Sequence, residues 1–246
     1  MSIEELKNLD VTLSIKGTTE AILKAIDTLD GDFCSLENSK TLDVINAKLL
    51  EVDEAFERPL DSPEVFSRLK GIASKAGKND LEAYCQEQIN MIAANDLHFK
   101  GYTQMFYGDC VKATKLLAEA AKLAPKHPLA AKDLKTAEKR LAKAGEDLVK
   151  APLQIEKNPD KPESWLKKAT ALVTMGRTEE AMEYFDKALA LDPNNPDALG
   201  KKGAALEGQG KFREAVPLFT KALVIKPTSQ IAKKGLNLAD YFSGSD

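Results

Sequence analysis

The sequence places a proline at a constant interval over its second half. The four prolines at this spacing are Pro125, Pro159, Pro193 and Pro227, each 34 residues after the last. Segments 162–195 and 196–229 also repeat each other between these prolines, with small or apolar residues at matching positions. A 34-residue period is typical of arrays of short helix pairs. One pair cannot bury its apolar face alone, so the period requires units that stack on one another.

The matching positions of the two segments have clear physical roles. The matched pairs are Trp165 with Leu199, Ala169 with Gly203, Leu172 with Leu206, Gly176 with Gly210, Ala181 with Ala215, Phe185 with Phe219 and Ala188 with Ala222. The two turn glycines, Gly176 and Gly210, can adopt the positive φ that ends a helix. The small residues let two helices approach closely, and the large ones fill the space between pairs. We therefore predict that Trp165, Leu172, Phe185, Leu206 and Phe219 are buried.

These segments resemble the tetratricopeptide repeat family. The resemblance extends to 94–127, with Gly101, Gly108 and Leu117 at the expected positions, and to a degenerate unit at 128–161, which lacks the turn glycine. It implies an all-α fold, a right-handed α-α superhelix, or solenoid, of helix pairs. Because Pro152 would interrupt the second helix of 128–161, we expect one long helix there, from about Leu129 to Leu148. The amphipathic segment 230–242 is predicted to be the helix that caps such an array.

Residues 1–92 are predicted to form a less regular helical region, separate from the array at 93–246. Apolar spacing indicates a helix over 18–29, with Thr18 or Thr19 as its cap, and another from about residue 38 to Pro59. Ser62 followed by Pro63 opens a third helix that runs to Gly77, and 78–94 is its partner. The pair at 63–92 resembles a further degenerate repeat. No stretch reads as a β-strand.

Charge divides the chain in the same place. Residues 1–92 hold 10 Lys and Arg against 18 Asp and Glu, whereas 93–246 hold 25 against 20. The acidic part therefore attracts the basic part, within one chain or between two. Two arrangements of residues 1–60 stay open: they continue the superhelix at its N-terminal end, or they fold across the basic groove of the array.

Several function classes are excluded or disfavoured by composition. There is no membrane-spanning apolar run, and the first ten residues are too polar for a signal peptide, so a cytoplasmic location is predicted. The array is only mildly basic and lacks an aromatic stacking platform, which argues against nucleic acid. The three cysteines, Cys34, Cys85 and Cys110, are scattered and are expected to be reduced thiols.

Catalytic chemistry has little support. The two histidines, His98 and His127, belong to no motif with a nucleophile or a metal-ligand set. The glycines of the segment 208–211 follow from the repeat register and lack the spacing of a phosphate-binding loop. We therefore predict a non-catalytic protein with no cofactor and no metal.

Recognition of another protein is what remains. The resemblance implies a concave groove, lined by the first helices, that binds a peptide or partner segment. The lysine and asparagine clamp that some members use for a C-terminal carboxylate is not expected, because Leu166, Thr170, Gly200 and Ala204 occupy two of its positions in successive repeats.

Lysines recur on the first helices at nearly the repeat period. The full set is Lys100, Lys132, Lys135, Lys167, Lys168, Lys201, Lys202, Lys233 and Lys234. One interpretation is a solvated face whose aliphatic stems cover the core. The other is a basic stripe that binds an acidic or phosphorylated segment, and for it the candidate partner-binding residues are Lys132, Lys167, Lys201 and Lys234. An alternative function is a structural subunit that self-associates into a homo-oligomer.

Overall fold

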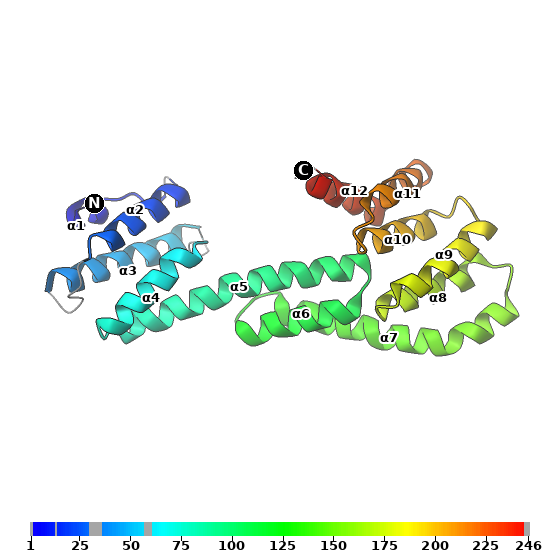
Figure 1. The fold of residues 1–246 in the computed structure, drawn as a ribbon, viewed down its shortest axis with the longest axis horizontal. Helices are drawn as coiled ribbons and strands as arrows, with labels where there is room; N and C mark the ends of the chain where they lie inside the picture. The colour runs from blue at the N-terminus through cyan, green and yellow to red at the C-terminus, as the bar shows by residue number, and fades with distance from the viewer. Residues whose placement is uncertain (1, 13, 30–35, 57–60, 244–246) are drawn as a thin grey trace. The chain divides into compact units, whose positions relative to one another are not determined.

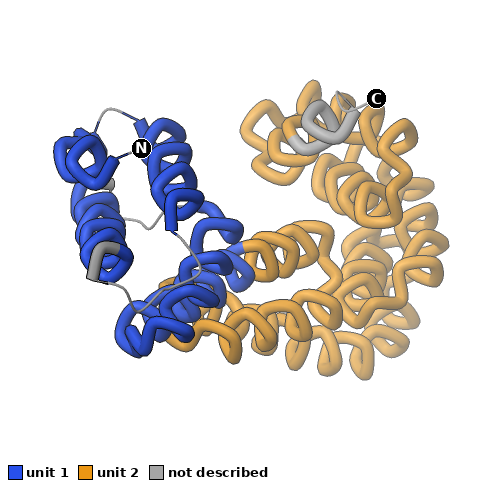
Figure 2. The backbone as a smooth tube through the Cα atoms, turned by 60° about the vertical axis from the view of Figure 1, so that its left-hand side comes forward, with its two compact units in different colours: residues 1–95 blue, residues 96–246 orange. Residues whose placement is uncertain are grey.

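The computed structural model describes residues 2–12, 14–29, 36–56 and 61–243. In these ranges all regular elements are α-helices, labelled α1 to α12 in chain order (Figure 1). The chain forms two compact units, Met1–Asn95 and Asp96–Asp246, which are coloured separately in Figure 2. Each unit has its own core and is described by itself.

The first unit contains α1 (Ile3–Lys7), α2 (Ile15–Asp27), α3 (Leu36–Phe56), α4 (Pro63–Lys75) and the first part of α5 (Asn79–Tyr107). One continuous core includes Ile22, Ile45, Leu49 and Phe66, all at most 1% exposed. The cap predicted at Thr18 or Thr19 is wrong: α2 starts earlier, because the Ser14 hydroxyl accepts a hydrogen bond from the Gly17 amide at 3.1 Å. Gly31, Cys34 and Pro59 lie outside the described residues, as does the side chain of Phe56.

The helix α5 differs from the prediction of two separate helices meeting near residue 94. It runs without a break from Asn79 to Tyr107. The segment 92–96 reads Ile-Ala-Ala-Asn-Asp and contains neither glycine nor proline, so nothing in it ends a helix. The division of the chain at residues 92 and 93 therefore falls inside a helix and stays a proposal about packing.

The second unit holds the repeats. After the end of α5 come α6 (Cys110–Leu123), α7 (Ala130–Lys157), α8 (Pro162–Thr174), α9 (Thr178–Leu191), α10 (Pro196–Glu207), α11 (Phe212–Ile225) and α12 (Gln230–Ser243). Successive helices pack as pairs, and the turn glycines Gly108, Gly176 and Gly210 have φ of 95°, 75° and 77°. The predicted fold class, an all-α solenoid of helix pairs that ends in a capping helix, is confirmed.

The core of the repeats follows the predicted register with one exception. Phe219, Phe185, Leu172 and Leu206 are 0%, 1%, 1% and 6% exposed. Trp165 was predicted to be buried and is only partly buried, because its indole Nε1 donates to the Pro159 carbonyl at 2.7 Å. An indole needs this partner for its N–H, so it stays at the edge of the core.

The helix α7 extends beyond the predicted end near Leu148. It continues through Pro152 to Lys157 (Figure 1). Its buried residues are Ala130, Ala137, Ala144 and Ala151, which recur every seven residues and continue beyond Leu148. Proline removes one backbone hydrogen bond, but the packing of α7 on both α6 and α8 keeps the chain helical. The unit 128–161 therefore does not fold back on itself.

The cap α12 closes the C-terminal end of the array. Ala232 is fully buried, and Ile231 lies against Gly200 of α10. A Cβ on Gly235 would lie 2.3 Å from the Phe219 ring, so the cap contacts the core directly. The side chains of Leu238 and Phe242 lie outside the described residues. In the part of the chain that the structure describes, no helix combines the length and the apolar character needed to cross a bilayer.

Candidate peptide-binding groove

A groove of about 500 Å³ lies within the second unit. Its walls come from the end of α5, the start of α6, and from α7, α8, α9, α10 and α12. Apolar side chains make up much of the lining, among them Phe106, Leu166, Val173 and Ile231. The charged residues that line it are Arg140, Lys143, Asp147, Glu163, Lys167 and Lys201. The groove is thus an apolar surface with charged groups on α7, α8 and α10.

Lys201 is the most enclosed of these cations. It is half-buried, and its Nζ lies 3.4 Å from the Thr170 hydroxyl on α8. Burial lowers the pKa of Lys201, partly opposed by the charge of Asp197. Among the described residues no carboxylate forms an ion pair with this ammonium group. Its three donors therefore have spare capacity that faces the groove.

Lys167 is held by a salt bridge across the groove wall. Its Nζ lies 3.3 Å from Oδ1 of Asp147 on α7, and its side chain is 43% exposed. Asp147 occupies a position where the repeats favour alanine, and this ion pair accounts for the departure. The Asp147 side chain is only 19% exposed, so it is the Lys167 ammonium group that a ligand carboxylate can reach from solvent.

The other two predicted binding residues lie elsewhere. Lys132 on the first turn of α7 and Lys234 on α12 are exposed, and neither lines the groove. The structure adds Arg140 and Lys143, which the repeat comparison missed because α7 has no regular partner in the alignment. A signal was present in the sequence: Arg140, Lys143 and Asp147 follow the spacing of one helix face.

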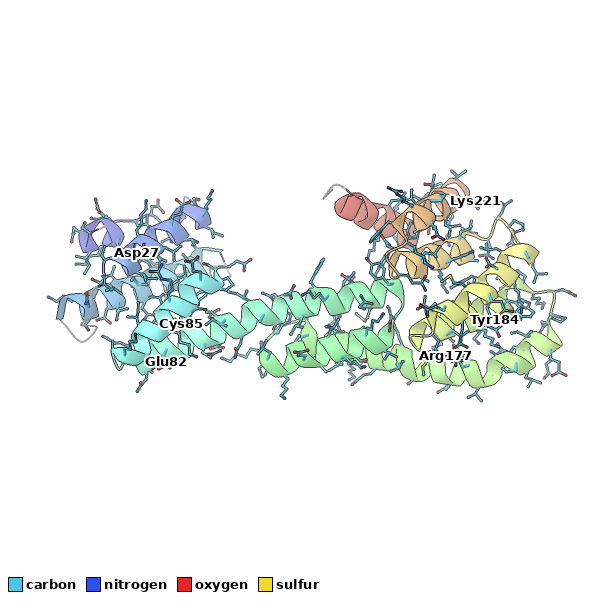
Figure 3. The ribbon with its side chains drawn as sticks, viewed as in Figure 1. Asp27, Glu82, Cys85, Arg177, Tyr184 and Lys221 are labelled. Atoms are coloured by element: carbon cyan, nitrogen blue, oxygen red, sulfur yellow. The ribbon has the colours of Figure 1, made fainter. Side chains whose placement is uncertain are left out.

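Three further lysines of the recurring set have partners outside the groove and do not line it. Lys168 donates from Nζ to the hydroxyl of Tyr184 at 2.9 Å, and Tyr184 is labelled on α9 in Figure 3. Lys202 on α10 pairs with Asp186, which lies on α9 like Tyr184. Lys100 pairs with Asp96 at 2.6 Å, one turn away on α5. These three lysines are solvated or packed between helices, as the first interpretation of the pattern predicts.

The two histidines lie together, which the sequence did not indicate. Their ring centroids are 4.8 Å apart, and His98 Nε2 lies 2.8 Å from Asp133 Oδ2. His127 Nδ1 accepts hydrogen bonds from the amides of Leu129 and Ala130, at 3.2 and 3.0 Å, and so caps the start of α7. Burial, followed by the charge of His98, lowers the pKa of His127. No group of three potential ligands suited to a metal ion occurs among the described residues.

The described cysteines are buried free thiols. Cys85 and Cys110 are 0% and 1% exposed, and Cys34 lies outside the described residues. Burial raises the pKa of Cys85 to about 11 and also raises that of Cys110. The thiolate form, which is the nucleophile, is therefore disfavoured at both positions.

Comparison with known proteins agrees with the repeat register. Residues 156–229 match the family model described as tetratricopeptide repeat. No curated protein sequence matches the chain. Similar solved structures include MamA of AMB-1, at 21% identity over 86% of this chain and 91% of that one, with a TM-score of 0.32.

Two further structures are similar at the same level. MamA from Desulfovibrio magneticus RS-1, from residue 41 to its end, is 20% identical over 81% of this chain and 98% of that one, with a TM-score of 0.32. The TPR2AB domain of yeast Sti1, in its pHSP90 complex, is 14% identical over 93% and 100%, with a TM-score of 0.30. TM-scores this low support no functional comparison. Residues 156–229, whose helix pairs follow the predicted register, therefore match the tetratricopeptide repeat family.

Proposed function

We propose that this protein is a non-catalytic scaffold that binds an acidic segment of a partner protein in the groove of the second unit. Proteins built from tetratricopeptide repeats generally mediate protein–protein interactions. The observation that carries the acidic specificity is Lys201, a half-buried ammonium group in the groove with no carboxylate partner among the described residues. A ligand carboxylate would supply that partner.

The charge of the groove supports the same choice of ligand. Four cationic side chains line it, Arg140, Lys143, Lys167 and Lys201, against the two acids Asp147 and Glu163. The excess of two positive charges favours an anionic segment. We include the exposed Lys132 and Lys234 in the proposal as flanking cations, which raise the rate of encounter more than the affinity.

The apolar lining adds a second requirement on the ligand. Phe106, Val173 and Ile231 offer little to a purely polar chain. Burying an apolar side chain contributes ~1.5–3 kcal/mol, which is comparable to a charge-assisted hydrogen bond. The preferred segment therefore carries an apolar side chain close to its acidic one.

Matched variants of two adjacent lysines test the proposal. Lys201 faces the groove, whereas Lys202 pairs with Asp186 outside it. In a peptide array probed with the full chain, acidic peptides with a neighbouring apolar residue should bind. For the best peptide, Lys201→Ala should weaken binding roughly tenfold or more, and Lys202→Ala less than about threefold. Binding should also weaken as the salt concentration is raised from about 0.05 M to about 0.5 M, because salt screens the charges.

Two results would overturn this function. The first is an array that yields only basic or wholly apolar peptides. The second is Lys201→Ala binding an acidic peptide as tightly as the unaltered protein does.

A second candidate function is self-association. It is favoured by Val149 and Leu153, which are 82% and 55% exposed and lie one turn apart on α7. An exposed apolar pair of this kind can pack against a second copy of the chain. Solution mass measured over a wide range of protein concentration tests this candidate, and a constant monomer mass would exclude it.

The location of the protein and the role of its first residues also stay proposals. We propose a cytoplasmic location, supported by the free thiols Cys85 and Cys110, which are typical of reducing compartments. We retain both arrangements for residues 1–60. Deleting them should cause aggregation with unchanged affinity if they extend the array, and should give a soluble protein with tighter binding if they cover the groove.

A further inference from the structure

Glu207 carries a buried carboxyl group that does not line the groove. It is the last residue of α10 and is 2% exposed, and neither of its carboxyl oxygens has a hydrogen-bond partner in the described part of the chain. The side-chain oxygen of Gln209, two residues later, is also buried without a partner. An ionised carboxylate in such a place would carry a large desolvation cost.

The repeat register shows that this is a packing position. Glu207 follows Val173 by 34 residues, so the two occupy the same place in successive repeats. Val173 is 5% exposed, and a Cβ added to Gly108 would lie 2.9 Å from its Cγ1. Val173 thus packs directly on the turn between α5 and α6. One repeat holds an apolar side chain here and the next holds a carboxyl group.

Tyr107 is the residue that packs against the carboxyl end of α10. It is 9% exposed, and a Cβ added to Gly208 would lie 2.9 Å from the Tyr107 Cβ. Burial, followed by the charge of Glu207, raises the pKa of Tyr107 to about 12. The end of α5 and the end of α10 are therefore in close contact, with the carboxyl group of Glu207 acting on the phenol.

Among the described residues no cation forms a hydrogen bond or an ion pair with the Glu207 carboxyl group. Burial alone raises the pKa of Glu207 to about 7. The cavity beside the contact is also lined by Asp109, which precedes α6, by Lys112 on α6 and by Lys211 after α10. Lys112 pairs with Asp109 at 3.2 Å. The other described charged groups on α10 and on its neighbours α8, α9, α11 and α12 are Glu163, Lys167, Lys168, Glu179, Glu180, Glu183, Asp186, Lys187, Asp197, Lys201, Lys202, Arg213, Glu214, Lys221, Lys233 and Lys234.

We propose that Glu207 is protonated when Tyr107 is packed against α10, and that its ionisation loosens this contact, which makes the contact a pH sensor in the fold. The neutral acid buries no charge, so it is compatible with a position that the preceding repeat fills with valine. Because Tyr107 also lines the groove, ionisation alters one end of that surface. The proposal needs no ligand and stands or falls independently of the function proposed above.

The direction of the pH effect follows from the two states. The folded chain keeps the Glu207 proton up to a pH of about 7, whereas the unfolded chain loses it near the ordinary value of 4.5. Between these values the folded state binds more protons, so its stability falls as pH rises and then becomes constant. The ratio of folded to unfolded chain should fall on the order of a hundredfold from this one group.

Unfolding of the full chain at several pH values tests the proposal. Two variants remove the titration: Glu207→Gln keeps the shape of the side chain, and Glu207→Val copies the preceding repeat. In both variants stability should decrease much less between about pH 5 and about pH 7.5 than it does in the original chain. The control is Glu179→Gln, because Glu179 is exposed and hydrogen-bonds Gln209 nearby, and it should keep the decrease. Variants at Glu207 with the unaltered pH profile would overturn the proposal.

Two direct measurements complete the test. Carboxyl carbon NMR, with the signal assigned by its loss in Glu207→Gln, should give a titration midpoint near 7, and a midpoint near 4.5 would overturn the proposal. Amide hydrogen exchange should show that protection at residues 107–113 falls roughly tenfold or more between about pH 6 and about pH 8. The rates are first corrected for the intrinsic pH dependence of exchange. Unchanged protection would show that the contact does not loosen.

Discussion

Segments 128–161 and 162–195 have the same length but opposite behaviour. The second folds back at Gly176, whose φ of 75° suits glycine, whereas the first has Ala142 at the matching place and stays helical from Ala130 to Lys157. The slot that Phe185 fills in the second is occupied by Ala151 in the first. A repeat can thus keep its length in sequence after losing the two residues that make it a helix pair.

The largest effect is expected where an aromatic ring fills the slot between pairs. Phe219→Ala should lower the free energy of unfolding by roughly 3–5 kcal/mol, and Phe185→Ala by a similar amount, because each leaves a cavity in a packed core. Ala151→Gly, at the matching position of α7, should cost only about 1 kcal/mol. Urea denaturation measures all three, and an unaltered midpoint for Phe219→Ala would show that the repeats do not pack as described.

The next effect concerns close packing in the regular pair. Gly203→Ala adds a Cβ 2.7 Å from the Phe219 ring, which Gly235 of α12 already confines from the other side. We expect the crowding to lower stability by roughly 1–3 kcal/mol. Thermal unfolding is the measurement. A variant as stable as the original would mean that the ring can move aside and that the contact with α12 is loose.

The start of α7 gives a pH effect of intermediate size. His127 caps α7 through Nδ1, whereas α10 is capped by the amide side chain of Asn195. The pKa of His127 is lowered in the folded state, so this cap is fully present above about pH 6.5 and is lost as pH falls below it. The loss should cost about 0.5–2 kcal/mol.

The experiment compares His127→Asn with the original, both in the Glu207→Gln background to remove the opposing slope. Asparagine can accept the same amide hydrogens and does not titrate. The stability of the variant should therefore fall less between about pH 6.5 and about pH 5 than that of the original. Equal acid sensitivity of the two proteins would show that protonation of His127 does not cause the loss of stability at low pH.

The smallest effect is a stabilisation. Gly145 lies inside α7, and a Cβ added to it would meet nothing within 4 Å. Gly145→Ala should raise stability by about 0.5–1 kcal/mol, because alanine loses less backbone freedom in a helix. The same substitution is thus expected to have opposite signs at Gly145 and Gly203. Destabilisation at Gly145 would indicate that this part of α7 is not a continuous helix.

The register of the regular repeats was predictable because it depends on local spacing. Phe185 and Phe219 recur with their neighbours, and burial of both follows from that recurrence. The path of α7 was harder to predict, because a proline inside a helix is a local signal that packing on two neighbours outweighs. Contacts that depend on this path, such as Lys167 with Asp147, were also missed.

The candidate site was predictable only in part for the same reason. Lys167 and Lys201 recur on regular first helices and do line the groove. Arg140 and Lys143 lie on α7, where the repeat alignment gives no guide to direction. Tyr107 and Glu207 are 100 residues apart, and their contact depends on how three helix pairs stack, which no local pattern encodes.

The capping helix has a consequence for the length of the array. It begins at Gln230, 34 residues after Pro196, so it occupies the place of the first helix of a further repeat. Its contacts with Gly200 and Phe219 are made to residues of the repeat before it. A duplicate of residues 196–229 inserted after Ser229 would present the same surface to α12. The protein can therefore be lengthened by whole repeats, by gene duplication or by design, without a new C-terminal end.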